Sequence, residues 1–300
     1  MDRDALELVR QAWRPLGKEL FNGDPSSEMD HGAYLDYYTK QWHLMMGPTR
    51  TADILGLLQR IQAGKPRLEV LAQLQGKGPQ GVGPVQADVE VPINLALRLI
   101  SMMKFGIARG QIMPRRCLAW NQGSLKEYLA DYFGKPPVLN CDRVRLPKSF
   151  HAWSIEKIGG IDVCFTDNLA DHLLLVEDDS KLLIFHHVCF LEYQHHDGQN
   201  ALFPDGLINE TLRTLALLFP EAQFGRKRTR GGKWLGRKRE VDRVLDARLA
   251  HCGNLQMEER QIEHFTYWRD RLVILKQAYD DATPGTLSQW WYDRRNGVQR

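Results

Sequence analysis

The feature that most constrains the fold is a change of hydrophobic pattern about half-way along the 300-residue chain. Between Ile161 and Tyr193, apolar residues come in four short runs, whereas elsewhere they recur at three- and four-residue steps. Short bounded runs favour strands, and the recurring steps favour helices. The polar stretch Glu177–Lys181 separates two of the runs and is typical of a hairpin turn. We therefore expect a predominantly helical α+β fold with a small antiparallel β-hairpin region around 160–193.

Local signals define two of the expected helices. Ser124 and Glu127 have the spacing of a capping box, in which two side chains satisfy the first amides of a helix, and Gly134 is suited to end that helix. Pro92 is typical of a first helical turn and predicts a second helix over 92–105. These two helices and the hairpin that follows them suggest a winged-helix-like module.

A glycine- and proline-rich segment suggests how the chain is divided. Residues 76–84 contain four glycines and two prolines, which disfavour both a helix and a central strand. We expect a linker over 76–90 that separates an N-terminal helical lobe, 1–75, from a main α+β domain, 91–300. The longest helix of the main domain is expected at 255–280, where apolar residues recur at helical spacing.

The net charge of +3 is unevenly distributed. The segment 226–239 contains eight basic residues and no acidic one, so the remainder of the chain is net acidic. Because glycines separate its two basic clusters, we expect a flexible basic loop that binds nucleic-acid phosphates or anionic lipid headgroups, or serves as a nuclear-import signal. The alternative is a solvated surface loop without a partner. The candidate polyanion-binding residues are Arg226, Lys227, Arg228, Arg230, Lys233, Arg237, Lys238 and Arg239.

The sequence contains no recognisable catalytic motif, and we expect no catalytic residue and no cofactor. Gly76–Gly81 matches the glycine spacing of a dinucleotide-binding loop, but a helix-like run precedes it where that loop requires a strand. There is no nucleophile elbow, no phosphate-binding loop with lysine and serine, and no paired Cys-x-x-Cys. An active site assembled from residues that are distant in sequence remains open.

A histidine-rich segment is the nearest approach to a metal site. If the fourth apolar run is a strand, His187 and Cys189 share one face and His186 lies on the other. One strand then cannot present all three to one zinc ion, and a site would need His195, His196 or the distant Cys164 and His172 to fold back. We therefore expect no bound metal.

Several phrases of the sequence resemble a large family of uncharacterised proteins of filamentous fungi. These phrases are Phe165–Leu175, Ile184–His187, Leu207–Pro220, Tyr267–Lys276 and Leu287–Asn296. The match covers roughly residues 90–299, and the same hairpin phrase and C-terminal segment are more distantly similar to plant DUF247 proteins. Neither resemblance implies a catalytic residue.

The resemblance also implies a relation to membranes. In the fungal family a membrane-spanning segment follows the phrase that here ends at Asn296, whereas this sequence ends at Arg300. A helix over Leu287–Arg295 would place aromatic and cationic side chains together, a mixture typical of the membrane interface. The candidate membrane-interface residues are Trp290, Trp291, Tyr292, Arg294 and Arg295.

Two functions follow as hypotheses. The first is a non-enzymatic interaction protein that acts beside a membrane, with an anionic membrane surface or another protein as its partner. The alternative is a nucleic-acid-associated protein that uses the basic loop 226–239. The acidic start of the chain is unlike a secretory signal, and the five scattered cysteines favour reduced thiols. We therefore expect an intracellular protein, membrane-associated if an anchor follows Arg300, or alternatively nuclear.

Overall fold

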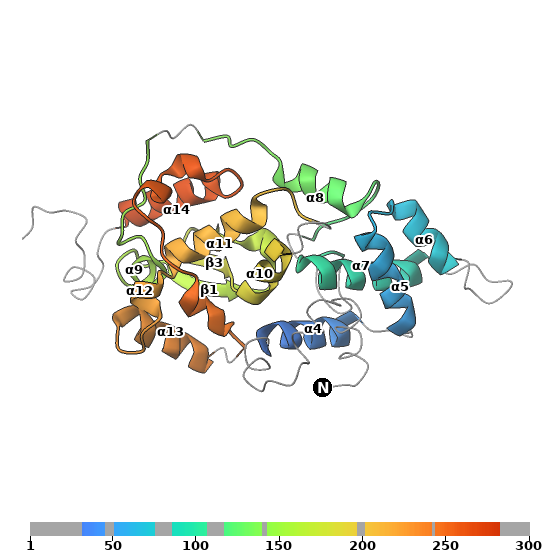
Figure 1. Ribbon diagram of the computed structural model, residues 1–300, viewed down its shortest axis with the longest axis horizontal. Coiled ribbons are helices and arrows are strands. Elements are labelled where there is room, and N and C mark those ends of the chain that lie inside the picture. Colours follow the sequence, from blue (N-terminus) through green and yellow to red (C-terminus); the bar gives the residue numbers. More distant parts are fainter. Residues whose placement is uncertain are drawn as a thin grey trace, which may run out of the picture. The chain divides into compact units, whose positions relative to one another are not determined.

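The computed structural model describes residues 32–45, 51–75, 86–106, 117–139, 143–196, 202–241 and 244–282. Helices predominate in these residues, and a small three-stranded sheet accompanies them (Figure 1). The expected α+β fold, predominantly helical, is confirmed.

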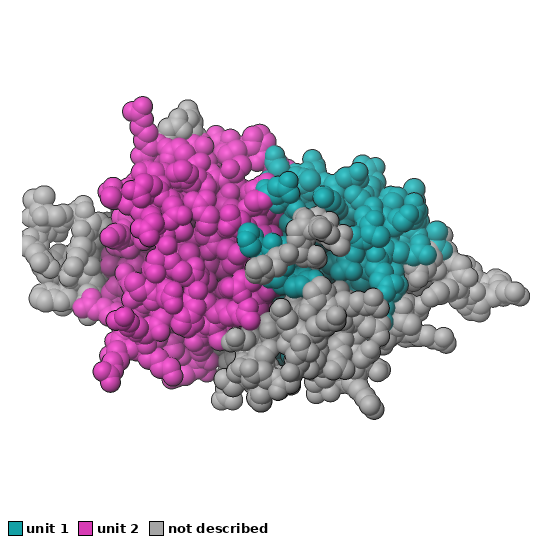
Figure 2. Space-filling view, in the orientation of Figure 1, with its two compact units in different colours: residues 1–134, 167–170, 193–205 teal, residues 135–166, 171–192, 206–300 magenta. Residues whose placement is uncertain are grey.

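The chain divides into two compact units, which Figure 2 distinguishes by colour. Unit 1 comprises Met1–Gly134, Asp167–Ala170 and Tyr193–Asp205, and unit 2 comprises Lys135–Thr166, Asp171–Glu192 and Gly206–Arg300. The division therefore follows Gly134 and does not fall at the expected linker. Residues 76–85 of that linker lie outside the described residues, and residues 86–90 are helical rather than extended.

Unit 1 contains five of the described helices. They are α4 (Gly32–Met45), α5 (Thr51–Gln62), α6 (Arg67–Gln75), α7 (Gln86–Ser101) and α8 (Leu125–Phe133). Helices α4, α5 and α6 pack against α7, whose residues Leu95, Leu97 and Leu99 are fully buried. Helix α7 begins six residues before Pro92, so this proline lies within the helix and not at its first turn.

The predicted capping box of α8 is confirmed. The Ser124 hydroxyl accepts a hydrogen bond from the Glu127 amide at 3.2 Å, and the Glu127 carboxylate accepts one from the Ser124 amide at 2.8 Å. Gly134 donates its amide to the carbonyl of Ala130 and closes the helix. The hydrogen bonds that close both ends of α8 are therefore made by residues within or next to the helix.

Unit 2 is built around a mixed sheet. Strand β3 (Lys181–Phe185) lies between β1 (Asp162–Thr166) and β2 (Leu174–Val176). The pairing of β2 with β3 is antiparallel, which confirms the predicted hairpin, but β1 pairs with β3 in parallel. The sheet that contains the predicted hairpin is therefore mixed. Glu177, Asp178 and Asp179 of the turn all have positive φ, of 53°, 53° and 61°.

The remaining helices include one that replaces a predicted strand. They are α9 (Ala152–Lys157), α10 (Val188–His196), α11 (Leu207–Leu218), α12 (Glu221–Phe224), α13 (Arg230–Val241) and α14 (Arg269–Asp281), with short 3₁₀ turns at η1 (Leu169–Asp171), η2 (Ala247–His251), η3 (Glu258–Arg260) and η4 (Ile262–His264). The fourth apolar run is thus part of α10. Helices α7 and α8 belong to unit 1 and the hairpin to unit 2, so the winged-helix-like grouping stays a prediction.

The prediction of a long helix over 255–280 is also wrong. Its first half forms two 3₁₀ turns, and only Arg269–Asp281 is α-helical. The buried carboxylate of Glu210 in α11 accepts hydrogen bonds from the amides of Thr266 and Trp268, both at 2.8 Å. Because these amides are committed to Glu210, the chain before α14 cannot continue an α-helix through them.

Candidate functional site

The basic segment is a helix rather than a flexible loop. Helix α13 occupies most of it, and the preceding residue Thr229 caps its start: the Thr229 hydroxyl accepts from the Gly232 amide at 3.1 Å, and its carbonyl accepts from the Lys233 amide. α13 packs against α9 and α12 within unit 2. The predicted flexibility of 226–239 is therefore wrong.

An apolar anchor holds one side of α13. Trp234 is 2% exposed, and its ring lies against those of Phe219 and Phe224, at centroid distances of 6.5 and 6.1 Å. Its indole N–H donates to the Glu156 carboxylate of α9 at 2.8 Å. A single tryptophan thus attaches a very polar helix to the core by both packing and a hydrogen bond.

Two of the eight predicted cations belong to this anchor. The Lys238 ammonium lies 2.6 Å from a Glu156 carboxylate oxygen and 3.2 Å from one of Asp162, and donates to the Val163 carbonyl at 2.8 Å. Burial favours the neutral form of Glu156, but hydrogen bonds from Lys238, Lys157 and Trp234 outweigh it and hold its pKa below the usual value. Lys238 therefore stabilises the fold.

Arg239 has a similar role. Its guanidinium donates to the carbonyls of Asp246 and Ala247 at 3.3 and 2.8 Å, next to the 3₁₀ turn η2. These contacts connect α13 to the start of that turn. Neither Lys238 nor Arg239 is thus available as a general polyanion contact.

The glycines that suggested flexibility are instead required by close packing. A Cβ atom at Gly232 would lie 2.0 Å from the Arg226 carbonyl oxygen, and one at Gly231 would lie 2.9 Å from that of Gln223. Gly236, further along α13, has no heavy atom within 4 Å of such a position. The first two glycines therefore let the start of α13 approach the preceding turn, and the third has no such role.

The remaining six cations form an exposed surface, which we call the basic face. It consists of Arg226, Lys227, Arg228, Arg230, Lys233 and Arg237, all exposed. Arg230 lies over the Trp153 ring, 5.8 Å from its centroid. In the part of the chain that the structure describes, the other five form no ion pair with a carboxylate, and Glu240 is the single acid of residues 226–241. The basic face thus concentrates positive charge.

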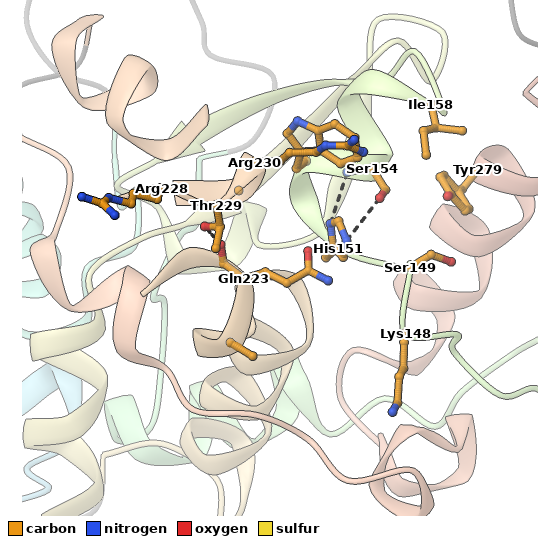
Figure 3. A pocket seen from close by; sticks show the side chains of 13 residues that line it. Lys148, Ser149, His151, Ser154, Ile158, Gln223, Arg228, Thr229, Arg230 and Tyr279 are labelled. Carbon is orange, nitrogen blue, oxygen red and sulfur yellow. Dashed lines mark hydrogen bonds between the residues drawn. The ribbon is translucent and has the colours of Figure 1, made fainter. Parts of the chain in front are cut away.

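A pocket of about 610 Å³ opens at the first turn of α13 (Figure 3). Its walls come from the segment before and within α9, from α12 and the turn that follows it, and from Tyr279 of α14. Three lining residues are cationic, namely Lys148, Arg228 and Arg230, and none of the thirteen lining residues is acidic. The sequence analysis did not identify this pocket.

A histidine and a serine within the pocket resemble a catalytic pair. The His151 ring nitrogens Nδ1 and Nε2 lie 3.3 Å from the Ser154 amide nitrogen and from the Ser154 hydroxyl, respectively (Figure 3). Burial lowers the pKa of His151 to about 4, so its ring is neutral near pH 7. Nδ1 accepts the amide hydrogen of Ser154 at the start of α9, and the direction of the contact between Nε2 and the Ser154 hydroxyl depends on which ring nitrogen carries the proton.

The contact of Nδ1 with the Ser154 amide gives His151 a structural role at the start of α9. The pair caps helix α9 and fixes the orientation of the Ser154 hydroxyl. The expectation of no catalytic residue remains a prediction for the chain as a whole.

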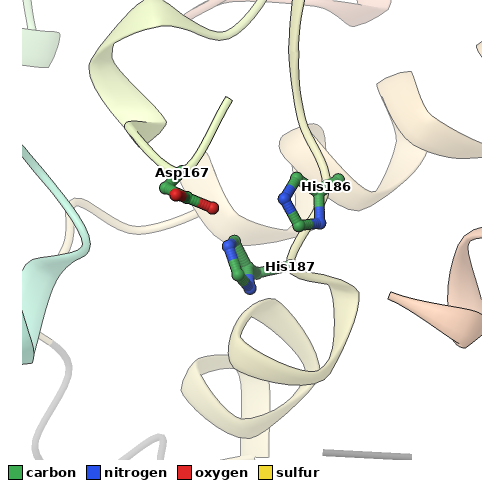
Figure 4. A group of neighbouring side chains, drawn as sticks. All are labelled: Asp167, His186 and His187. Carbon is green, nitrogen blue, oxygen red and sulfur yellow. The ribbon is translucent and has the colours of Figure 1, made fainter. Parts of the chain in front are cut away.

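The histidines of the predicted metal segment lie side by side. His186 and His187 follow β3, and their rings are stacked with centroids 4.0 Å apart (Figure 4). Asp167, the third residue drawn there, belongs to unit 1. The two-faced strand that separated the histidines in the sequence analysis does not exist. The expectation of no bound metal thus stays a prediction without that argument.

The cysteine of the same segment is a buried thiol. Cys189 lies in the first turn of α10 and is buried, and burial raises the pKa of its thiol well above the usual value. Cys117, Cys164, Cys189 and Cys252, the four cysteines within the described residues, are all free thiols.

The candidate membrane-interface residues Trp290, Trp291, Tyr292, Arg294 and Arg295 lie outside the described residues. Among the residues that are described, no helix combines the length and the apolar character needed to span a bilayer. The membrane hypothesis therefore stays a prediction.

Comparisons with known proteins add no relative. The sequence matches no family model, and neither a curated protein nor a solved structure shows significant similarity to it. The resemblances noted in the sequence thus remain predictions, and a function has to be argued from the geometry alone.

Proposed function

We propose that unit 2 is a nucleic-acid-associated module that binds phosphates through the basic face. The observation that supports this proposal is the separation of two kinds of cation on one helix. Lys238 and Arg239 are used within the fold, whereas the six cations of the basic face are exposed. An array of exposed cations on one helix and the turn before it attracts polyanions and releases their counterions on binding.

The spacing along α13 suits a phosphate backbone. Arg230, Lys233 and Arg237 follow at steps of three and four residues, so they share one side of the helix. At a rise of about 1.5 Å per residue, the first and last are separated by about 10 Å along the axis. Successive phosphates of one duplex strand rise by about 3.4 Å, so this side can face more than one of them.

The burial of α13 favours nucleic acid over a lipid bilayer. A helix that inserts into the membrane interface needs an exposed apolar side. The apolar side of α13, which includes Trp234 and Leu235, is buried within unit 2. Contact with lipid at this helix is thus restricted to headgroup charge, whereas nucleic acid offers a denser array of phosphates.

Binding should be independent of sequence. Lysine and arginine contacts to phosphates carry no sequence information by themselves. We therefore expect comparable affinity for duplexes of different sequence and a steep fall in affinity with rising salt.

The test is the double variant Lys233→Gln/Arg237→Gln, measured by fluorescence anisotropy against a mixed-sequence duplex at several salt concentrations. Removing two phosphate contacts should weaken binding about tenfold near physiological salt and reduce the slope of log K against log[salt] by about 2. The matched control is Lys126→Gln/Lys135→Gln, which removes two exposed lysines elsewhere. This control should change the affinity much less.

Two results would overturn the proposal. One is equal binding by the native chain and the Lys233→Gln/Arg237→Gln variant. The other is binding to phosphatidylserine vesicles but not to the duplex at the same salt concentration, which would favour the membrane-side function.

A further inference from the structure

We infer that the pocket at the first turn of α13 binds a small aromatic phosphate, of the chemistry found in a mononucleotide. The pocket and the basic face share Arg228 and Arg230, but Lys148, Trp153 and Ser154 belong to the pocket alone. The inference therefore does not depend on the binding of a polyanion. Its volume of about 610 Å³ lies within the range of small-molecule sites.

The charge of the pocket selects an anion. In the view of Figure 3, the His151–Ser154 pair lies between Arg230 and Lys148. Lys148, Arg228 and Arg230 are the charged residues of the lining, since it contains no acid and burial keeps His151 neutral, so the lining carries net positive charge. The amino end of α13 adds partial positive charge to the same wall, since Arg230 and Gly231 of its first turn line the pocket.

A buried hydroxyl adds a directed hydrogen-bond donor. Ser154 is 2% exposed and lines the pocket, and its hydroxyl lies 3.3 Å from Nε2 of His151. When Nε2 carries the ring proton, the Ser154 oxygen accepts it and the hydroxyl can donate its own hydrogen to a ligand oxygen.

The apolar lining selects a planar group. Trp153, Ile158 and Tyr279 line the pocket together with the polar residues. Trp153 is half-buried, and the Arg230 guanidinium lies 5.8 Å from its ring centroid. An aromatic ring can therefore pack on these side chains while its phosphate is held by Arg230, Lys148 and Ser154.

The test is isothermal titration of the full chain with AMP, phenyl phosphate, inorganic phosphate and adenosine. We expect AMP or phenyl phosphate to bind with one site per chain, and inorganic phosphate and adenosine to bind at least about tenfold more weakly, because each lacks one half of the recognised chemistry. Failure of both aromatic phosphates to bind at millimolar concentration would overturn the inference.

Variants of the pocket and of the basic face test where the ligand binds. Ser154→Ala and Lys148→Gln should each weaken AMP binding about tenfold, since each removes one donor to the phosphate. Ser154→Ala keeps the backbone amide that donates to His151 at the start of α9. If Ser154→Ala does not fold, Trp153→Leu provides a second pocket variant. Lys233→Gln/Arg237→Gln should leave AMP affinity unchanged. If that variant alone lost AMP binding, the ligand would lie on the basic face and the inference would be wrong.

The same variants keep the two proposals distinguishable. Ser154→Ala and Lys148→Gln should bind duplex DNA almost as the native chain does, because neither residue belongs to the basic face. Loss of AMP binding with DNA binding intact in these variants would support the pocket independently, whereas a native chain that binds DNA but not AMP would support the basic face alone.

Discussion

Helices α8 and α13 are stabilised in different ways. Helix α8 is closed by its own sequence: Ser124 and Glu127 exchange hydrogen bonds across three residues, and Gly134 ends it. Helix α13 has a cap at Thr229, but its anchoring partners are distant, since Trp234 and Lys238 bind residues 78 and 76 positions earlier. A capped helix can therefore be recognised from local sequence, whereas an anchored helix cannot.

The comparison of α8 with α13 predicts that, of these variants, substitution of Trp234 lowers the stability most. Replacing Trp234 with alanine removes a ring that is 2% exposed and the indole N–H that binds Glu156. We expect unit 2 to lose about 3–5 kcal/mol of unfolding free energy. Urea unfolding followed by circular dichroism measures this loss. Arg237→Gln is the control on the exposed side of the helix, and a loss as small as that of the control would show that α13 does not need its anchor.

Smaller changes in stability, opposite in sign, are expected for alanine substitutions at two glycines of α13. Gly232→Ala places a methyl group 2.0 Å from the Arg226 carbonyl oxygen, and we expect it to cost about 1–3 kcal/mol. Gly236→Ala meets no atom within 4 Å and should stabilise the helix by about 0.5–1 kcal/mol. Thermal unfolding of the two variants should thus shift in opposite directions. Stabilisation by both substitutions would instead support the interpretation of residues 226–239 as a flexible loop.

The smallest loss of stability is expected for removal of the Ser124 cap of α8. Ser124→Ala removes the acceptor of the Glu127 amide and should cost unit 1 about 1 kcal/mol, while Ser124→Asp should retain most of the stability. Hydrogen exchange of the first amides of α8 measures the effect locally. A loss comparable to that of Trp234→Ala would mean that α8 also depends on distant packing through its cap.

The same distinction explains which parts of the fold could be predicted. The β2–β3 hairpin and its polar turn were predictable because both strands and the turn lie within a dozen residues. The fourth apolar run resembles a strand, yet it forms α10, whose early amide at Cys189 donates to the Asp246 carboxylate at 2.9 Å. This acceptor lies 57 residues further along the chain, so no local pattern reveals it.

The basic residues and the pocket differ in the same way. The sequence identified all eight cations, but it could not separate the six exposed ones from Lys238 and Arg239, whose partners are distant. For the pocket, the sequence does bring Lys148, His151 and Ser154 together within seven residues. The remaining walls come from α12–α13 and α14, and only the fold places them there.

The histidine cap of α9 also makes unit 2 sensitive to acid. Protonation of His151 at Nδ1 would remove the acceptor of the Ser154 amide, and burial opposes it by lowering the pKa from 6.5 to about 4. The neutral ring therefore contributes its full stability above about pH 6.5, and that contribution is lost as the pH falls towards 4. Acidification thus loosens the end of α9 from which Ser154 enters the pocket, so the wall weakens before a phosphate ligand loses all of its charge.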